Sequence, residues 1–221
     1  MPVEAVIFDF GGVFTTSPFE NFNRYEAESG LPRDLIRRVN SLNPDTNAWA
    51  LFERGAIDMD RFDALFLEET AALGHPMPGR AVMPLLSGAI RPRMVAALAA
   101  CKRRFKVGCI TNNMASDESP GRRPFKDPAR QAAIREIMGS FDHLIESSLA
   151  GVRKPDPKIY LMMCEALGVA PGGCVYLDDL GINCKPAAAL GMTAIKVVSE
   201  EQALADLSRV TGLALGAGAV A

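Results

Sequence analysis

The sequence lacks the cysteine and histidine patterns that mark disulfide-rich proteins and zinc sites. Its 221 residues include five cysteines, an odd number, and no two of them are spaced as a C-x-x-C pair. Such cysteines are typical of reduced thiols in a cytosolic protein. The two histidines, His75 and His143, have no spacing to each other or to acidic residues that indicates a metal or catalytic pair. A disulfide framework and a zinc site are therefore both disfavoured.

An excess of charge of one sign and long hydrophobic runs are also absent from the sequence. The formal net charge is −2 at pH 7, which does not favour nucleic acid or an anionic membrane as a partner. No apolar run approaches the ~20 residues that a membrane helix needs, and the amino terminus enters a predicted strand rather than a secretory signal. These absences predict a soluble cytoplasmic protein and leave a homodimer open.

The chain is long enough for one sizeable domain or one domain with an insertion. The first predicted strand covers residues 3–9, and the segment 16–88 then carries helical spacing of apolar residues with charges on the opposite face. From residue 89 onward, helices alternate with predicted strands at 106–111, 143–147, 173–178 and 193–198. This alternation predicts a doubly wound parallel α/β sheet with both faces covered. We assign residues 1–15 and 89–221 to this core and residues 16–88 to a helical insertion.

Polar residues stand where successive strands of this predicted sheet end. In an open parallel sheet, ligand sites form outside the carboxyl ends of the strands. Each residue alone is typical of a helix cap or a turn, but polar groups at four successive strand ends favour a metal or phosphate site. The residues at these ends are Asp9, Thr111, Asn112, Lys154, Asp178 and Asp179.

The residue types indicate phosphoryl-transfer chemistry. Three carboxylates without histidine suit a hard cation such as Mg²⁺. Lys154 can neutralise a phosphoryl group and keep Asp9 ionised beside the other acids. The hydroxyl of Thr111 and the amide of Asn112 supply donors for phosphoryl oxygens, and a carboxylate can act as a nucleophile that forms an aspartyl-phosphate.

The motifs around these residues resemble those of a known superfamily. DFGGV with Asp9, ITNN with Thr111, RKPDPKIY with Lys154 and YLDD with Asp178-Asp179 are similar, in order and spacing, to the four motifs of haloacid-dehalogenase-like (HAD) hydrolases. The second half looks most like the phosphatase domain at the amino terminus of soluble epoxide hydrolases and of some acyl-CoA dehydrogenase fusions. The resemblance implies a Rossmann-like core, and it implies that segment 16–88 is a small α-helical cap that covers the site and selects substrate. Epoxide hydrolysis is not implied, because that activity belongs to a separate domain.

The resemblance also implies a metal site. Asp9 would be both the nucleophile and a Mg²⁺ ligand. The main-chain carbonyl of Gly11 would be a second ligand and Asp179 a third, with Asp178 acting through water.

Three further roles follow from the resemblance. Thr111 and the region of Asn112 would bind the phosphoryl oxygens, and Lys154 would orient the nucleophile and the phosphate. The implied substrate is a small phosphorylated metabolite.

Gly11 is a departure from the family pattern. Phosphatases of the family usually carry a second Asp at this position, which protonates the leaving alcohol and later activates water. Loss of such a group commonly costs ~10²–10⁴ in rate, or about 3–5 kcal/mol of barrier. We therefore expect a phosphatase that is weak or restricted to good leaving groups.

Three other functions remain open at this stage. A 2-haloacid dehalogenase also lacks the second Asp and needs no metal, although the doubled acid Asp178-Asp179 is what Mg²⁺ favours. A catalytically silent module that binds a phosphate ligand or a partner is the second, and phosphoryl transfer between sugars is the third. The basic loop that follows Thr111 carries Arg122, Arg123 and Lys126, and these residues are candidates for contact with an anionic substrate.

Overall fold

The computed structural model describes residues 2–114 and 128–215. At its centre is a parallel sheet of five strands in the order β3-β2-β1-β4-β5. The strands are β1 (Ala5–Phe8), β2 (Lys106–Thr111), β3 (His143–Glu146), β4 (Cys174–Asp178) and β5 (Thr193–Lys196). The strand order reverses between β1 and β4, and this is the kind of switch point at which ligands bind. The predicted doubly wound α/β sheet is confirmed, although β1 is shorter at both ends than the predicted strand 3–9.

The register of the strands brings their carboxyl ends to one level. Phe8, the last residue of β1, is paired with Cys109 of β2 and with Leu177 of β4. Asp9 continues the ladder by one residue, because its N–H donates to the carbonyl of Leu177 at 2.8 Å. Asp9 and Asp178 therefore leave neighbouring strands side by side.

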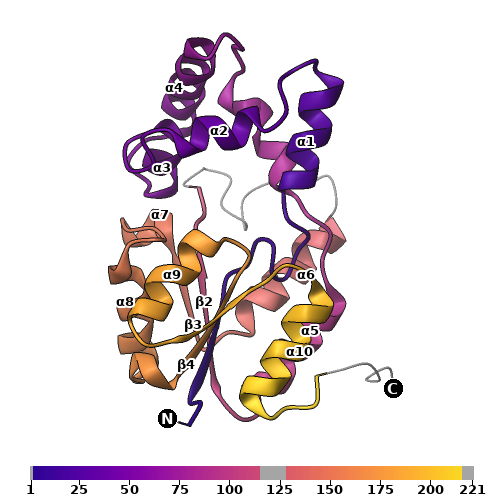
Figure 1. Cartoon of the computed structure of the whole chain (residues 1–221), viewed down its shortest axis with the longest axis vertical. Helices are drawn as coiled ribbons and strands as arrows, with labels where there is room; N and C mark the ends of the chain where they lie inside the picture. The colour runs from indigo at the N-terminus through magenta and orange to yellow at the C-terminus, as the bar shows by residue number, and fades with distance from the viewer. Residues whose placement is uncertain (1, 115–127, 216–221) are drawn as a thin grey trace.

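Helices cover both faces of the sheet (Figure 1). Alternate strand residues face opposite sides, so Val6 and Phe8 join one apolar cluster and Ala5 and Ile7 join another. The first cluster includes residues of α5 (Pro92–Lys102), α6 (Pro128–Gly139) and α10 (Glu200–Thr211). The second includes residues of α8 (Pro157–Leu167) and α9 (Gly181–Ala189). Two short elements that the sequence did not predict are the helix α7 (Ser147–Ala150) and the 3-10 turn η3 (Pro171–Gly173).

The inserted segment is helical and has an apolar cluster of its own. Figure 1 shows its helices stacked beyond the carboxyl end of the sheet. They are α1 (Phe19–Glu28), α2 (Leu35–Ser41), α3 (Ala48–Glu53) and α4 (Met59–Ala72), followed by the 3-10 turns η1 (Gly79–Ala81) and η2 (Met83–Leu86). Helices α3 and α4 begin at side-chain caps, Asn47 and Asp58, each of which accepts a backbone N–H. Among the fully buried residues of the cluster are Ile36, Phe52, Phe62 and Phe66.

Two stretches of the chain connect the sheet to this segment, and these two stretches are hydrogen-bonded to each other. Thr15 and Ile90 form an isolated antiparallel bridge. The N–H of Thr16 donates to the carbonyl of Ala89 at 2.8 Å, and the N–H of Arg91 donates to that of Phe14 at 2.8 Å. Within the described ranges 2–114 and 128–215, no helix has the length and apolar character needed to span a membrane.

Candidate active site

Asp9 stands at the end of the central strand β1, with only 8% of its surface exposed. Its Oδ1 accepts the N–H of Phe10 at 2.7 Å and lies 2.7 Å from Nζ of Lys154. Burial raises the pKa of Asp9 to about 8, although the Lys154 ammonium acts to lower it. The carboxylates of Asp178 and Asp179 raise the same pKa further, since like charges disfavour ionisation.

Lys154 is the cation of the site, and it is buried with 1% of its surface exposed. Its Nζ lies 2.7 Å from Asp9 and 2.9 Å from Oδ2 of Asp178, and it donates to the carbonyl of Ile110 at 3.0 Å. Burial favours the neutral amine, but Asp178 and Asp9 outweigh it and hold the pKa of Lys154 above its ordinary value. The side chain thus carries a fixed positive charge between two carboxylates.

Asp178 is completely buried, and protein donors already occupy its carboxylate. Besides Lys154, it accepts the Tyr176 hydroxyl at 2.5 Å, the N–H of Leu180 at 2.8 Å and the Asn183 amide at 3.1 Å to both oxygens. Because donors already occupy both oxygens, Asp178 is better placed to orient Lys154 than to bind a metal directly. Tyr176 and Asn183 were not singled out from the sequence, although Tyr176 lies two residues before Asp178 on one strand and therefore faces the same side.

Asp179 has fewer protein partners than Asp178. Its Oδ2 accepts the hydroxyl of Ser17 at 3.1 Å, from the passage between β1 and α1. Burial and the charge of Asp178 raise the pKa of Asp179 to about 6.

The three carboxylates form a group that fits a hard cation. One oxygen each from Asp9, Asp178 and Asp179 lies within 4.8 Å of the others. Oxygen ligands at this density, buried and mutually repulsive, are what a divalent cation such as Mg²⁺ stabilises. The raised pKa values of Asp9 and Asp179 have the same main cause, which is burial, and the charge of Asp178 raises both further.

The two glycines after Asp9 differ in their surroundings. Gly12 has a φ of +72°, and a Cβ there would lie 2.2 Å from Cγ of Asp179. Its carbonyl accepts a hydrogen bond from the Arg91 guanidinium at 2.7 Å. Gly11 has an ordinary φ, and no atom of the described residues lies within 4 Å of a Cβ added to it. Open space therefore exists where the family usually places an acidic side chain.

Thr111 and Asn112 follow β2 at the same edge. Thr111 is buried at the strand end. The side chain of Asn112 is engaged with the main chain of Lys154, from which it accepts at 2.9 Å and to which it donates at 3.0 Å. The contact of the Asn112 region with a phosphoryl group stays a prediction. The loop residues Arg122, Arg123 and Lys126 lie outside the described residues.

Comparisons with known proteins agree with this arrangement. Residues 3–191 match the sequence model of the haloacid dehalogenase-like hydrolases. Bifunctional epoxide hydrolase 2 of Mus musculus is 30% identical over 96% of this chain, which spans only 39% of that protein. Phosphatase MT3486 of Mycobacterium tuberculosis is 27% identical over 99% of this chain and all of its own.

A solved structure shows the same fold. The HAD family enzyme bt-2542 of Bacteroides thetaiotaomicron, in complex with magnesium and inorganic phosphate, has a TM-score of 0.58 at 18% identity and covers 90% of this chain and 96% of its own. Fold, site and family match lead to one conclusion: the chain belongs to the haloacid dehalogenase-like hydrolases.

Proposed function

We propose that this chain is a Mg²⁺-dependent phosphatase that hydrolyses a small phosphorylated metabolite through an aspartyl-phosphate on Asp9. The observation that carries the proposal is the placement of the Lys154 ammonium, 2.7 Å from Asp9 and 2.9 Å from Asp178, beside a group of three carboxylates. The full-length similarity to phosphatase MT3486 and the magnesium and phosphate bound to bt-2542 support it.

The proposed metal ligands are the carboxylates of Asp9 and Asp179 and the main-chain carbonyl of Gly11. Asp178 would act through water, since protein donors engage its own oxygens. Bound Mg²⁺ supplies positive charge that offsets the charge of the phosphoryl group.

The protein's own residues account for two chemical steps. A carboxylate oxygen of Asp9 attacks phosphorus, and the bond from phosphorus to the leaving oxygen breaks. Water then attacks the phosphorus of the aspartyl-phosphate and gives its proton to solvent, and the bond from phosphorus to the Asp9 oxygen breaks, which releases inorganic phosphate and restores the Asp9 carboxylate. Lys154 holds Asp9 in place and stabilises the charge of the phosphoryl oxygens, and Thr111 and the N–H of Asn112 donate to those oxygens.

Gly11 sets the limits of this chemistry. Without an acid at this position, an alkyl alcohol must leave without a proton from the usual donor, whereas aryl and acyl groups leave readily as anions. We propose that the enzyme favours such substrates or acts slowly on others. Residues 16–88 serve as the cap in this proposal and residues 1–15 and 89–221 as the core, with the cap selecting the substrate.

The proposed setting is the cytoplasm, with no nucleic-acid or membrane partner. All five cysteines are free and buried, as is typical of proteins in reducing compartments.

A 2-haloacid dehalogenase is the second candidate, because such an enzyme has no use for an acid at Gly11. Its nucleophilic carboxylate displaces a halide and needs no cation. The group of three acids, of which Asp9 and Asp178 are buried and Asp179 is partly buried, favours the phosphatase, since dehalogenation needs no cation for such a group to bind.

The experiment that separates these functions is a release screen with and without Mg²⁺. Sugar, acyl, aryl and lipid phosphates are assayed for phosphate, and 2-chloropropionate is assayed for chloride. We expect phosphate release from acyl and aryl phosphates only with Mg²⁺. Metal-independent chloride release would replace the proposal with a dehalogenase, and binding of Mg²⁺ and phosphate with no turnover would indicate a silent module.

A further inference from the structure

The carboxylate of Glu53 is buried at the junction between the cap and the core. Glu53 is the last residue of α3, and 7% of its surface is exposed. Its Oε1 accepts the indole N–H of Trp49 on the same helix at 2.9 Å. Its Oε2 lies 2.7 Å from Nε of Arg153 and accepts the Asn112 amide at 3.2 Å. One cap carboxylate thus binds two residues of the core.

These two core residues adjoin the proposed phosphate-binding groups. Asn112 directly follows Thr111, and Arg153 directly precedes Lys154. The Asn112 amide that donates to Glu53 also donates to the Lys154 carbonyl at 3.0 Å, while its oxygen accepts the N–H of Lys154 at 2.9 Å. The Asn112 side chain therefore connects Glu53 of the cap to the main chain of Lys154.

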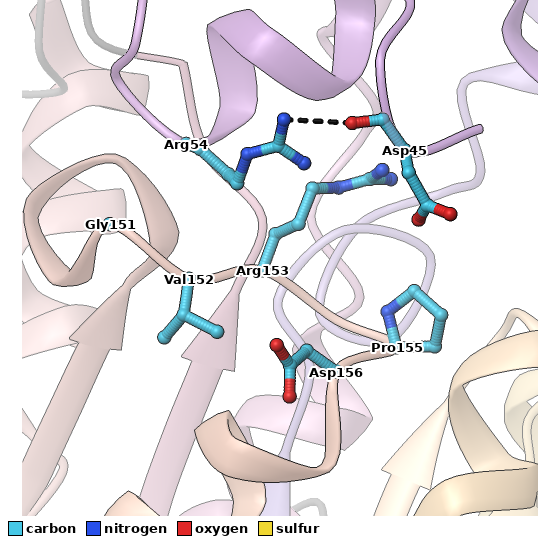
Figure 2. A pocket seen from close by; sticks show the side chains of 7 residues that line it. All are labelled: Asp45, Arg54, Gly151, Val152, Arg153, Pro155 and Asp156. Atoms are coloured by element: carbon cyan, nitrogen blue, oxygen red, sulfur yellow. Dashed lines mark hydrogen bonds between the residues drawn. The ribbon is translucent and has the colours of Figure 1, made fainter. Parts of the chain in front are cut away.

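Two further hydrogen bonds join the cap to the core next to the Glu53 carboxylate. The Ser147 hydroxyl at the start of α7 donates to the Glu53 carbonyl at 2.5 Å. The Arg153 guanidinium also donates to the carbonyl of Pro44 in the cap at 2.9 Å. Figure 2 shows the Arg153 side chain beside that of Arg54. Both line a cavity of about 310 Å³ at the junction. Arg54 donates instead to the Asp45 carbonyl within the cap, at 2.8 Å.

We infer that Glu53 is a positioning residue, which fixes Lys154 through Asn112 and Arg153 and so makes the catalytic site depend on a seated cap. The inference rests on the phosphatase function proposed above. Burial of a carboxylate is costly unless its partners are in place, so the Glu53 carboxylate depends on the nearby Arg153 charge and on the Asn112 amide that donates to it. If the cap shifts, the hydrogen bonds that hold the Lys154 main chain through Asn112 weaken. A displacement of about 1 Å in a positioning group can cost ~10²-fold in rate.

The test compares Glu53→Ala and Glu53→Gln with Glu69→Gln. Glu69 is a matched cap carboxylate, because it accepts the N–H of Ala48 at the other end of the same helix at 2.8 Å. Hydrogen exchange at the Lys154 amide reports its clamping without any turnover, and kcat and KM are measured on an aryl phosphate with Mg²⁺. We expect Glu53→Ala to lower kcat by ~10–100-fold with little change in KM, and to speed exchange at Lys154. Glu53→Gln should lie between Glu53→Ala and wild type, and Glu69→Gln should match wild type.

A second pair of variants tests the contact between Glu53 and Arg153 from the core side. Arg153→Gln should reproduce the kcat and exchange effects of Glu53→Ala, whereas Arg54→Gln, which lines the same cavity, should not. This pair decides the matter if Glu53→Ala does not fold. The inference is overturned if exchange at Lys154 and kcat in the Glu53 and Arg153 variants equal those of Glu69→Gln and Arg54→Gln. If exchange responds as expected but wild type hydrolyses no phosphate ester, the positioning role stands and the phosphatase proposal falls.

Discussion

Gly12 and Asp179 approach each other so closely that no side chain fits between them. A Cβ on Gly12 would lie 2.2 Å from both Cγ and Oδ2 of Asp179, and the φ of Gly12 is +72°. The backbone of the turn after β1 therefore lies in close contact with the Asp179 carboxylate.

Replacement of Gly12 by alanine should disturb both the fold and the metal site. The positive φ and the clash predict a loss of about 1–3 kcal/mol in the free energy of unfolding, and the displaced Asp179 should weaken Mg²⁺ binding. Gly11→Ala is the matched control, because its Cβ enters open space. Thermal denaturation and calorimetry with Mg²⁺ measure both effects. Equal melting temperatures and equal Mg²⁺ affinities for the two variants would contradict this reading of the turn.

Mg²⁺ should bind wild type and raise its melting temperature by linkage. At a concentration 100 times Kd, the free energy of unfolding should rise by about 2.7 kcal/mol. Asp179→Asn should weaken binding, since it removes the charge of a proposed ligand that has one side-chain donor, Ser17. Calorimetry that shows no Mg²⁺ binding to wild type, with and without phosphate, would contradict the proposed Mg²⁺ dependence.

Gly11→Asp should restore the missing acid–base group. The ordinary φ at this position avoids backbone strain, and within the part of the chain that the structure describes the new Cβ meets no clash. Turnover of an alkyl phosphate should rise, by at most ~10²–10⁴-fold, and an aryl phosphate should gain much less. A crystal structure of the variant checks the position of the carboxyl. If the carboxyl reaches the leaving-group side and alkyl phosphates show no selective gain, another residue supplies the proton.

Tyr176→Phe should weaken the support of Asp178. It removes a hydroxyl that donates to a buried charged group at 2.5 Å, and hydrogen bonds to charged groups are worth about 1.5–3 kcal/mol. We expect a lower melting temperature together with a lower kcat, because Asp178 holds Lys154. Tyr160→Phe is the control, since its hydroxyl donates to the Asn183 carbonyl instead. A kcat of Tyr176→Phe equal to that of wild type would show that Tyr176 serves stability alone.

The meeting of Asp9, Lys154 and Asp178 follows from features that a sequence carries. Buried apolar runs and their glycine or polar endings locate the strands, and parallel strands in register place their carboxyl ends at one edge. Asp9 and Asp178 had to be neighbours once β1 was paired with β4, whereas Lys154 reaches them from the segment that follows α7.

Other parts of the site depend on packing between distant segments, which the local pattern does not determine. Glu53 reaches Arg153 across 100 positions of the chain because α3 is seated on α7. The sequence shows two adjacent glycines, and only the backbone reveals that Gly12 needs its φ while Gly11 does not. The Asn112 side chain is paired with the carbonyl and N–H of Lys154, and the local sequence does not indicate this pairing.

The most direct test of the account is a rapid acid quench of wild type during turnover of an aryl phosphate with Mg²⁺, followed by mass measurement of the peptide that contains Asp9. Gly11 supplies no acid–base side chain to activate water, so the second step should be slower than the first and the aspartyl-phosphate should accumulate. The account predicts one phosphoryl group on Asp9 in a large fraction of the enzyme, and none in Asp9→Asn, which should be inactive. An unmodified Asp9 during phosphate release, together with substantial activity in Asp9→Asn, would contradict the covalent mechanism.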